Sequence, residues 1–260
     1  MGKTIAITNR KGGCGKTTTC VNLGIGLARQ GKKILLIDAD NQFSLTISMG
    51  VKEPNKLPIT LATIISDIIA KKEINPTTGI IHHAEGIDLM PANDSLTGME
   101  LTLAPLMGRE IILRKYINKI KPLYDYILID TSPTLDILTI NTLAAASSVI
   151  IPVVPKYLDA KGLELLLKSI ENIREDINPN LSILGILLTM SENRTNFSKA
   201  IINMIREAYN EEIRIFKQSI PQSIRAAEAS ATGQSIFAHD PTGKIALAYA
   251  ALTEEVVENG

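Results

Sequence analysis

Cysteine is scarce in this sequence, and its scarcity excludes a fold held together by a disulfide framework. The 260 residues contain two cysteines, Cys14 and Cys20. Their spacing matches neither a C-x-x-C redox motif nor a zinc-binding pair, so we expect a reducing compartment, by default the cytoplasm. A chain of this length can bury about 70–75% of the surface that its unfolded form exposes, and it therefore needs neither disulfides nor a structural metal to hold a core.

Long hydrophobic runs and an excess of one charge are also lacking. The longest apolar runs fall far short of the roughly 20 residues that cross a bilayer. Polar Asn9, Arg10 and Lys11 come too early for the apolar core of a signal peptide. We therefore expect neither export nor a membrane partner. The 27 Lys and Arg residues balance 27 Asp and Glu residues, which argues against a constitutive nucleic-acid binder but permits a local basic patch.

Short β-branched segments alternate with longer segments of helical periodicity along the whole chain. This alternation predicts an α/β fold, with a doubly wound, mostly parallel sheet and helices on both faces. No long linker, low-complexity segment or internal repeat divides the chain, so residues 1–260 are expected to form a single domain. The predicted strands cover residues 3–8, 33–37, 87–90, 126–129, 149–153 and 181–188, and the predicted helices cover residues 16–29, 59–70, 110–121, 134–146, 160–173 and 196–209.

A glycine-rich segment lies between the first predicted strand and the first predicted helix. Its glycines let the backbone turn tightly and direct N–H groups at phosphate oxygens, and the following helix adds its positive N-terminal end. This is the arrangement of a P-loop NTPase, in which Lys16 reaches the β- and γ-phosphates and Thr17 ligates magnesium. A tight connection without a ligand is the alternative interpretation. The residues expected to bind nucleotide here are Lys11, Gly12, Gly13, Cys14, Gly15, Lys16, Thr17 and Thr18.

Carboxylates follow two of the predicted strands. Asp38 and Asp40 come after the second strand, and Asp130 comes after the fourth. These positions lie at the carboxyl ends of parallel strands, where an open α/β sheet binds its ligands. Asp130 fits the role of holding a magnesium-bound water. Acidic residues after buried strands also serve as helix N-caps or loop formers, which is the alternative interpretation.

The phosphate loop resembles that of the deviant Walker A ATPases of the ParA/MinD family, which carry the pattern K-G-G-x-G-K-T/S. The resemblance implies ATP and Mg²⁺ as cofactors and an ATP-dependent homodimer. Lys11 would reach the partner subunit's phosphates and stabilise the transferring phosphoryl group in trans. Asp40 would orient or activate the attacking water, and Asp38 would support the magnesium ion and its water shell. Lys11, Lys16 and Asp40 are thus the expected catalytic residues, and Thr17, Asp38 and Asp130 the expected metal-binding residues.

Residue 10 is arginine where the ordinary P-loop has glycine, and Lys11 adds a second lysine to the loop. The sequence also departs from the family pattern at other positions. The family commonly has Asp-Pro-Gln-Gly where this chain has Asp40-Asn41-Gln42-Phe43, and Pro-Pro where it has Ser132-Pro133. The last two departures can alter the mobility of the loops around the phosphates and the rate of hydrolysis. The loops around Met190 and Pro221 are implied to flank the adenine.

Within the family, residues 138–143, 157–163 and 187–190 resemble short, Soj-like ParA partition ATPases. Segment 252–260 contains acidic residues, whereas membrane-targeting relatives end in a basic amphipathic helix. The first predicted strand begins at Lys3, so we do not expect a preceding helix-turn-helix arm. The resemblance implies binding to nonspecific double-stranded DNA through Arg194 and Arg225, stimulation by a ParB-like centromere-binding protein, and association with the nucleoid. Relatives often carry a basic residue where this chain has Gln222. The basic segment 109–121 is a weaker candidate for the same surface.

Two other functions remain open on the sequence alone. One is a MinD-like or cargo-positioning ATPase that acts on a membrane or a protein assembly rather than on DNA. The other is an electron-transfer ATPase related to nitrogenase iron proteins. Cys14 lies inside the phosphate loop and Cys20 on the following helix, and neither position suits an iron–sulfur cluster shared at a distant dimer face. We therefore expect a colourless protein.

Overall fold

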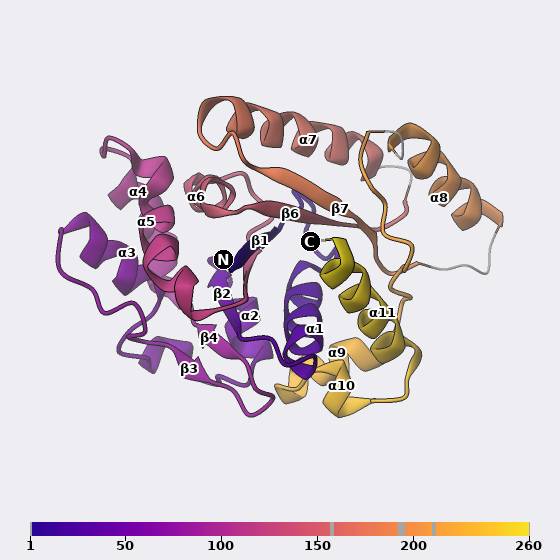
Figure 1. The fold of residues 1–260 in the computed structure, drawn as a ribbon, viewed down its shortest axis with the longest axis horizontal. Helices are drawn as coiled ribbons and strands as arrows, with labels where there is room; N and C mark the ends of the chain where they lie inside the picture. The colour runs from indigo at the N-terminus through magenta and orange to yellow at the C-terminus, as the bar shows by residue number, and fades with distance from the viewer. Residues whose placement is uncertain (1, 157–158, 192–195, 210–211, 260) are drawn as a thin grey trace.

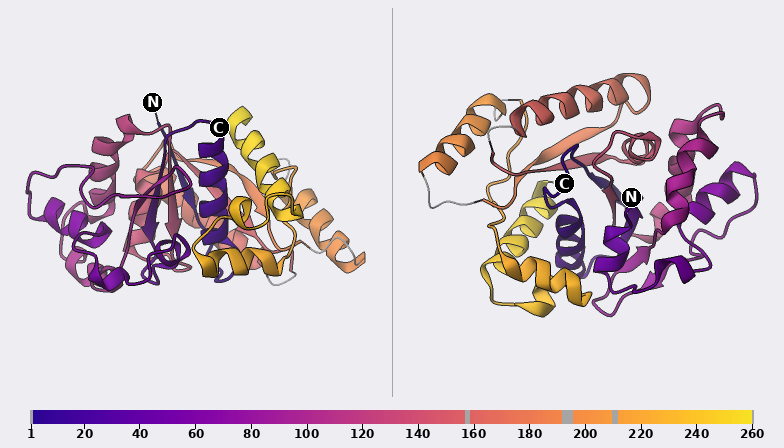
Figure 2. Two further views of the ribbon diagram at one scale, coloured as in Figure 1. Left: turned by 90° about the horizontal axis from the view of Figure 1, so that it is seen from below. Right: turned by 180° about the vertical axis from the view of Figure 1, so that it is seen from behind.

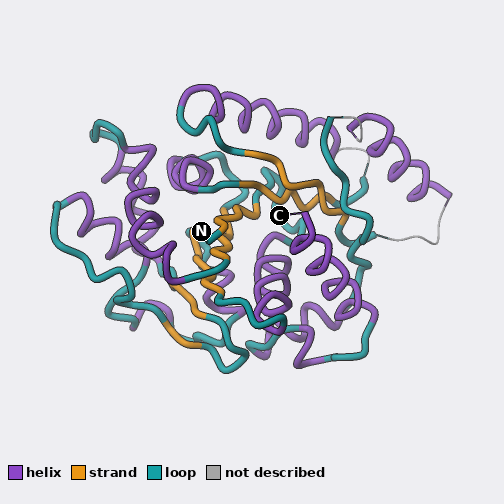
Figure 3. The backbone as a smooth tube through the Cα atoms, viewed as in Figure 1, coloured by secondary structure: helices purple, strands orange, loops and turns teal. Residues whose placement is uncertain are grey.

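The fold is a layered α/β arrangement, with a central sheet between two sets of helices (Figures 1 and 3). The computed structural model describes residues 2–156, 159–191, 196–209 and 212–259. In this part of the chain seven strands form one sheet in the order β3-β4-β2-β5-β1-β6-β7. The strands are β1 (Lys3–Ile7), β2 (Ile34–Ala39), β3 (Ile81–His82), β4 (Asp88–Met90), β5 (Tyr126–Thr131), β6 (Ser148–Val153) and β7 (Ser182–Leu188).

The sheet is parallel except for the pairing of β3 with β4. Every residue of β2 and β5 is buried, because helices cover both faces. The helices are α1 (Lys16–Arg29), α2 (Ser44–Ser48), α3 (Leu61–Ile69), α4 (Met99–Leu103), α5 (Ile112–Ile120), α6 (Ile137–Ala145), α7 (Asp159–Asp176), α8 (Asn196–Tyr209), α9 (Ile224–Thr232), α10 (Ile236–His239) and α11 (Lys244–Asn259). Short 3₁₀ segments are η1 (Pro54–Lys56), η2 (Asp94–Gly98), η3 (Arg109–Ile111) and η4 (Lys121–Leu123).

Successive side chains of each strand point to opposite faces of the sheet, so the apolar core is divided between these two faces. Leu36 and Leu128 face α1, α10 and α11, whereas Leu35 and Ile127 face α3 and α5. A further cluster joins β6 and β7 to α6, α7 and α8. The two additional views of Figure 2 show helices on either side of the sheet. The expected fold class, a doubly wound and mostly parallel sheet with helices on both faces, is therefore confirmed.

The predicted elements agree with the observed ones where local pattern is strong. The bounds of α1 and α8 match the predicted ranges 16–29 and 196–209, and the six predicted strands are present with shifts of one or two residues. The antiparallel strand β3 and the helices α2, α4, α9, α10 and α11 were not predicted. No helix in the described part of the chain is both long and apolar enough to span a membrane.

The C-terminal helix α11 completes the layer beside α1, and the two lie side by side in Figure 1. Its buried residues include Ile245, Tyr249, Leu252 and Val256, which recur at helical spacing and pack in the same core cluster as α1. The acidic residues noted in the sequence lie on the same helix, and Glu254 is exposed. This segment is therefore part of the core of the fold.

Candidate nucleotide site

The glycine-rich segment connects β1 to α1 at the carboxyl edge of the sheet. Gly13 and Gly15 have φ angles of 70° and 86°, in the left-handed region that glycine adopts without steric cost. Gly15 is the N-cap of α1, and the helix has no side-chain cap. The first N–H groups of α1 therefore point into the loop, where they can bind an anion.

Two side chains outside the loop, one just before it and one far away in the sequence, hold it in place. Asn9 accepts a hydrogen bond from the Lys11 N–H at 3.0 Å through its Oδ1, and its Nδ2 donates to the Pro152 carbonyl on β6. Thr189, directly after β7, donates from Oγ1 to the Cys14 carbonyl at 2.8 Å. The sequence analysis did not single out Asn9 or Thr189, although both follow predicted strands at the same edge of the sheet.

The two lysines of the loop have different environments. Lys16 is 7% exposed, and its Nζ donates to the Lys11 carbonyl at 3.2 Å. Lys11, like Gly12 and Gly13, is exposed at the tip of the loop. Lys16 is thus held within the loop, whereas Lys11 lies on its outer surface.

Asp130 at the end of β5 is fully buried beneath the loop. The Thr17 hydroxyl donates to Asp130 Oδ2 at 2.6 Å, and Asp130 Oδ1 has no hydrogen-bond partner among the described residues. Burial, and after it the nearby Asp38 carboxylate, raises the pKa of Asp130 well above its usual value. An unsatisfied, buried carboxylate oxygen beside a hydroxyl is the oxygen set that Mg²⁺ prefers. The residues present therefore fit a magnesium ion that would offset this buried charge.

Asp38 at the end of β2 is also fully buried, but its oxygens have partners. Its Oδ2 accepts from both the N–H and the hydroxyl of Thr46 in α2, and its Oδ1 accepts from the Asp40 N–H at 3.2 Å. Burial raises the pKa of Asp38 to about 7, although the bonds from Thr46 lower it. Asp38 thus fixes the start of α2 to the sheet edge, a contact that the sequence analysis did not predict, and its metal role remains a prediction.

Asp40 lies on the turn between β2 and α2. It is 7% exposed, and its Oδ1 accepts a hydrogen bond from Gln42 N at 3.0 Å. Phe43, which stands where the family commonly has glycine, has a φ of 42° in the left-handed region. That conformation is costly for a bulky side chain. Phenylalanine at position 43 therefore adopts a strained backbone conformation, three residues after Asp40.

The segments that contain Met190 and Pro221, the residues expected near adenine, lie side by side at the edge of the sheet. Ser191 pairs with Pro221 in an isolated parallel bridge, and Ser191 N donates to the Ile220 carbonyl at 3.0 Å. Met190 is 37% exposed and has a φ of 49°. Because its neighbour Thr189 contacts the phosphate loop, Met190 lies beside the expected nucleotide position.

Of the two candidate DNA-binding arginines, the structure describes only Arg225. Arg225 at the start of α9 is exposed and forms an ion pair with Glu228 at 3.0 Å. Hydrogen bonds from His239 and then Arg225 lower the pKa of Glu228. Arg194 lies outside the described residues.

The weaker candidate, the basic segment 109–121, is partly used inside the protein. Arg114 donates from Nε to the Ala144 carbonyl at 2.7 Å and from Nη2 to the Ile177 carbonyl at 3.0 Å. The Arg114 guanidinium is therefore engaged with carbonyls at the ends of α6 and α7, and the role of segment 109–121 at a DNA surface stays a prediction.

The two cysteines are buried on the loop and helix of this site. Cys14 donates from Sγ to the Lys11 carbonyl at 3.2 Å. Burial raises the pKa of Cys14, and it raises that of Cys20 further. Both thiols are therefore held in the protonated form that ligates iron poorly.

Comparisons with known proteins agree with this geometry. A family model described as an AAA domain matches residues 2–183. The sporulation initiation inhibitor protein Soj of Bacillus subtilis (strain 168) is 39% identical over 260 residues, which is 100% of both chains. The chromosome-partitioning ATPase Soj of Thermus thermophilus is 38% identical over 255 residues, 97% of this chain and 94% of that one.

A solved structure extends the agreement to three dimensions. The cobyrinic acid a,c-diamide synthase from Mycobacterium smegmatis, with a bound ATP analog and magnesium, is 31% identical with a TM-score of 0.87, over 99% of this chain and 95% of that chain. One fold can carry different activities, so the family assignment comes from the full-length sequence relatives and the phosphate loop. On these grounds the chain belongs to the ParA/MinD family of P-loop ATPases, among its Soj-like members.

Proposed function

We propose that this protein is a DNA partition ATPase whose ATP-bound homodimer binds nonspecific double-stranded DNA. A ParB-like centromere-binding protein then stimulates hydrolysis, and the dimer leaves the DNA. The observation that carries the proposal is the exposed Lys11 and buried Lys16 on a phosphate loop whose Thr17 hydroxyl donates to Asp130, in a chain 39% identical to a Soj protein over its full length. We propose a cytoplasmic, nucleoid-associated location on the same basis.

At the nucleotide, each side chain has a separate task. The loop N–H groups and Lys16 bind the phosphates, and Thr17 and Asp130 hold Mg²⁺, which neutralises charge on the phosphate oxygens. Asp40, whose Oδ1 accepts a hydrogen bond from the Gln42 N–H, orients the attacking water. The exposed Lys11 enters the partner subunit's site and stabilises charge that develops on the transferred phosphoryl group. Hydrolysis removes the group that Lys11 binds, so the dimer separates.

At the DNA, Arg194 and Arg225 neutralise phosphates without reading bases. The chain carries no net charge, and in the single subunit Arg225 is paired with Glu228. Dimerisation doubles the number of arginines on one surface, so that DNA phosphates compete more effectively with Glu228. A neutral subunit can thereby bind DNA only in its ATP state.

The first test measures binding to random duplex DNA with ATP, with ADP and without nucleotide, over a salt series. Asp40→Ala holds the ATP state by slowing hydrolysis. We expect binding that requires ATP and weakens steeply with salt, by a slope of about 0.9 per phosphate contact. An ATP-dependent dimer that ignores DNA would contradict the proposal and would point to a membrane or a protein assembly as the partner.

Arg225→Ala tests the DNA surface, alone and together with Arg194→Ala. The matched control is Arg174→Ala, since Arg174 is also exposed and paired with a glutamate, Glu171, three residues away on a helix. We expect the double variant to lose DNA binding and the control to keep it. Unchanged, salt-sensitive binding in the double variant would remove these arginines from the proposal.

A further inference from the structure

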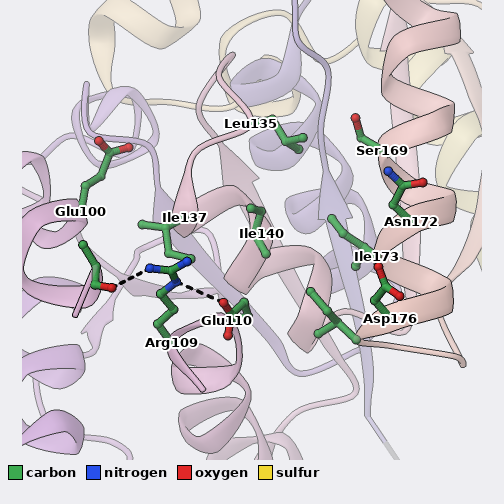
Figure 4. A pocket seen from close by; sticks show the side chains of 12 residues that line it. Glu100, Arg109, Glu110, Leu135, Ile137, Ile140, Ser169, Asn172, Ile173 and Asp176 are labelled. Carbon is green, nitrogen blue, oxygen red and sulfur yellow. Dashed lines mark hydrogen bonds and ion pairs between the residues drawn. The ribbon is translucent and has the colours of Figure 1, made fainter. Parts of the chain in front are cut away.

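A second cavity, apart from the phosphate loop, lies between α4, α6 and α7. Figure 4 shows it with the side chains that line it. Its volume is about 590 Å³, which is large enough to hold several amino-acid side chains of a bound peptide. None of its lining residues belongs to the phosphate loop, and Arg225 is not among them, whereas Arg109 and Glu110 come from the basic segment 109–121. The nucleotide site described above therefore does not use this cavity.

The floor of the cavity is apolar. Ile137 and Ile140 belong to α6, and Leu135 lies two residues before this helix. Ile173 belongs to the last turn of α7, and Ile177 directly follows it. The floor lies where two core clusters meet, because Ile137 packs on the cluster around α5 whereas Leu135 and Ile140 pack on the cluster around β6. Leu135, Ile137 and Ile140 are only partly buried. A partner side chain placed here would complete their burial.

The rim of the cavity carries more negative than positive charge. Its charged residues are Glu100, Arg109, Glu110 and Asp176. Arg109 is engaged within the protein, because it pairs with Glu110 at 3.1 Å and donates to the Ala104 carbonyl. Among the described residues no ion pair involves Glu100 or Asp176, and both are exposed. Figure 4 places them on opposite sides of Ile140. Two uncompensated carboxylates therefore flank an apolar floor.

The segment that forms the α4 side of the cavity also exposes large apolar side chains. Leu101, next to Glu100, is 83% exposed, and Met107 is 100% exposed. Exposed apolar residues that adjoin a groove are typical of protein interaction surfaces. This segment thus exposes apolar side chains in addition to those that line the cavity.

We propose that this cavity docks a peptide segment of a partner protein in which apolar side chains are flanked by lysine or arginine. The apolar side chains fill the floor between α6 and α7, and the basic side chains pair with Glu100 and Asp176 on either side. Charge complementarity selects this occupant over an acidic segment or a nucleic acid. The proposal goes beyond the partition function and requires neither DNA nor nucleotide.

The test uses a display library of short random peptides, selected on the purified full-length protein without DNA or nucleotide. Selected sequences are then synthesised with a fluorescent label, and their dissociation constants are measured by fluorescence polarisation. We expect enrichment of sequences that combine apolar residues with flanking lysine or arginine. Failure to enrich any peptide, or enrichment without basic residues, would overturn the proposal.

Two variants of α7 decide whether the selected peptides occupy the cavity. Asp176→Lys reverses a rim charge, whereas Glu175→Lys makes the same change one residue earlier, at an exposed position that does not line the cavity. Both lie in the last turn of α7, where a positive charge favours the helix, so both variants should fold. We expect Asp176→Lys to weaken peptide binding by about fivefold or more and Glu175→Lys to leave it within about twofold. Equal binding to both variants would overturn the proposal. Glu100→Lys, on the opposite side, repeats the test on a second element.

Discussion

At the level of single residues, the burial of Asp130 has a measurable consequence. Asp130→Asn replaces a fully buried carboxyl group whose ionised form is disfavoured by burial and by nearby Asp38, so the nucleotide-free protein should not lose stability. We expect the unfolding temperature of the unchanged protein to rise with ATP and to rise further when Mg²⁺ is added, because ligands of the folded state stabilise it. In Asp130→Asn the increment from Mg²⁺ should vanish. Differential scanning fluorimetry measures both effects.

The control for this prediction is Asp94→Asn, which makes the same chemical change at an exposed position outside the nucleotide site. It should keep the full increment from Mg²⁺. An undiminished increment in Asp130→Asn would show that Mg²⁺ is held without this carboxylate, and the metal role proposed for Asp130 would then be wrong.

At the level of elements, Arg114 joins three helices. From α5 its guanidinium donates to the carbonyls of Ala144 and Ile177, at the ends of α6 and α7. Hydrogen bonds from a charged donor contribute about 1.5–3 kcal/mol each, and less where water can replace them. Because Arg114 is only partly buried, Arg114→Ala should lower the free energy of unfolding by about 2–4 kcal/mol. Urea denaturation measures the change. Lys115→Ala, at the exposed neighbour, should stay within about 0.5 kcal/mol of the unchanged protein, and equal effects would contradict the assigned role.

The contact between α1 and α11 depends on a glycine. A Cβ added to Gly26 would overlap Thr253 Oγ1 and lie 3.3 Å from Thr253 Cβ. Overpacking costs about 1–3 kcal/mol, which exceeds the gain of about 1 kcal/mol that alanine brings to a helix. Gly26→Ala should therefore destabilise the protein in thermal unfolding. The double variant with Thr253→Ala should recover most of the loss, since Thr253 donates only to Tyr249 of its own helix.

Gly162 in α7 supplies the control for this prediction. No atom of the described residues lies within 4 Å of a Cβ added there, so Gly162→Ala should leave stability unchanged or raise it through helix propensity alone. If Gly26→Ala were as harmless as Gly162→Ala, the close packing of α11 on α1 would be contradicted.

At the level of the whole molecule, we propose that residues 1–260 unfold as a single domain. Tyr116 is buried between α5 and one face of the sheet, and Tyr249 is buried on the other face. The chain has no tryptophan, so tyrosine fluorescence reports on both faces. We expect the fluorescence transition in urea to coincide with loss of helix by circular dichroism. Two separate transitions would indicate two folding units.

The sequence alone was sufficient for the features that depend on local pattern. The predicted and observed bounds of α1 coincide because the phosphate loop has a fixed relation to the helix that it opens. The buried strands were recognisable because parallel strands covered on both faces consist of continuous apolar runs. The phosphate loop, Asp38, Asp40 and Asp130 could be found because each begins within three residues of the end of a predicted strand.

Other features required the tertiary structure, because they join residues far apart in the chain. Thr189 reaches the phosphate loop across 175 positions of sequence, and Arg114 contacts Ile177 across 63. Two-residue β3 is too short to have a periodicity, and α11 was judged by its charge rather than by its apolar spacing. Sequence therefore determined the strands and the chemistry at their ends, whereas long-range hydrogen bonding and close helix packing decided which distant side chains hold that chemistry in place.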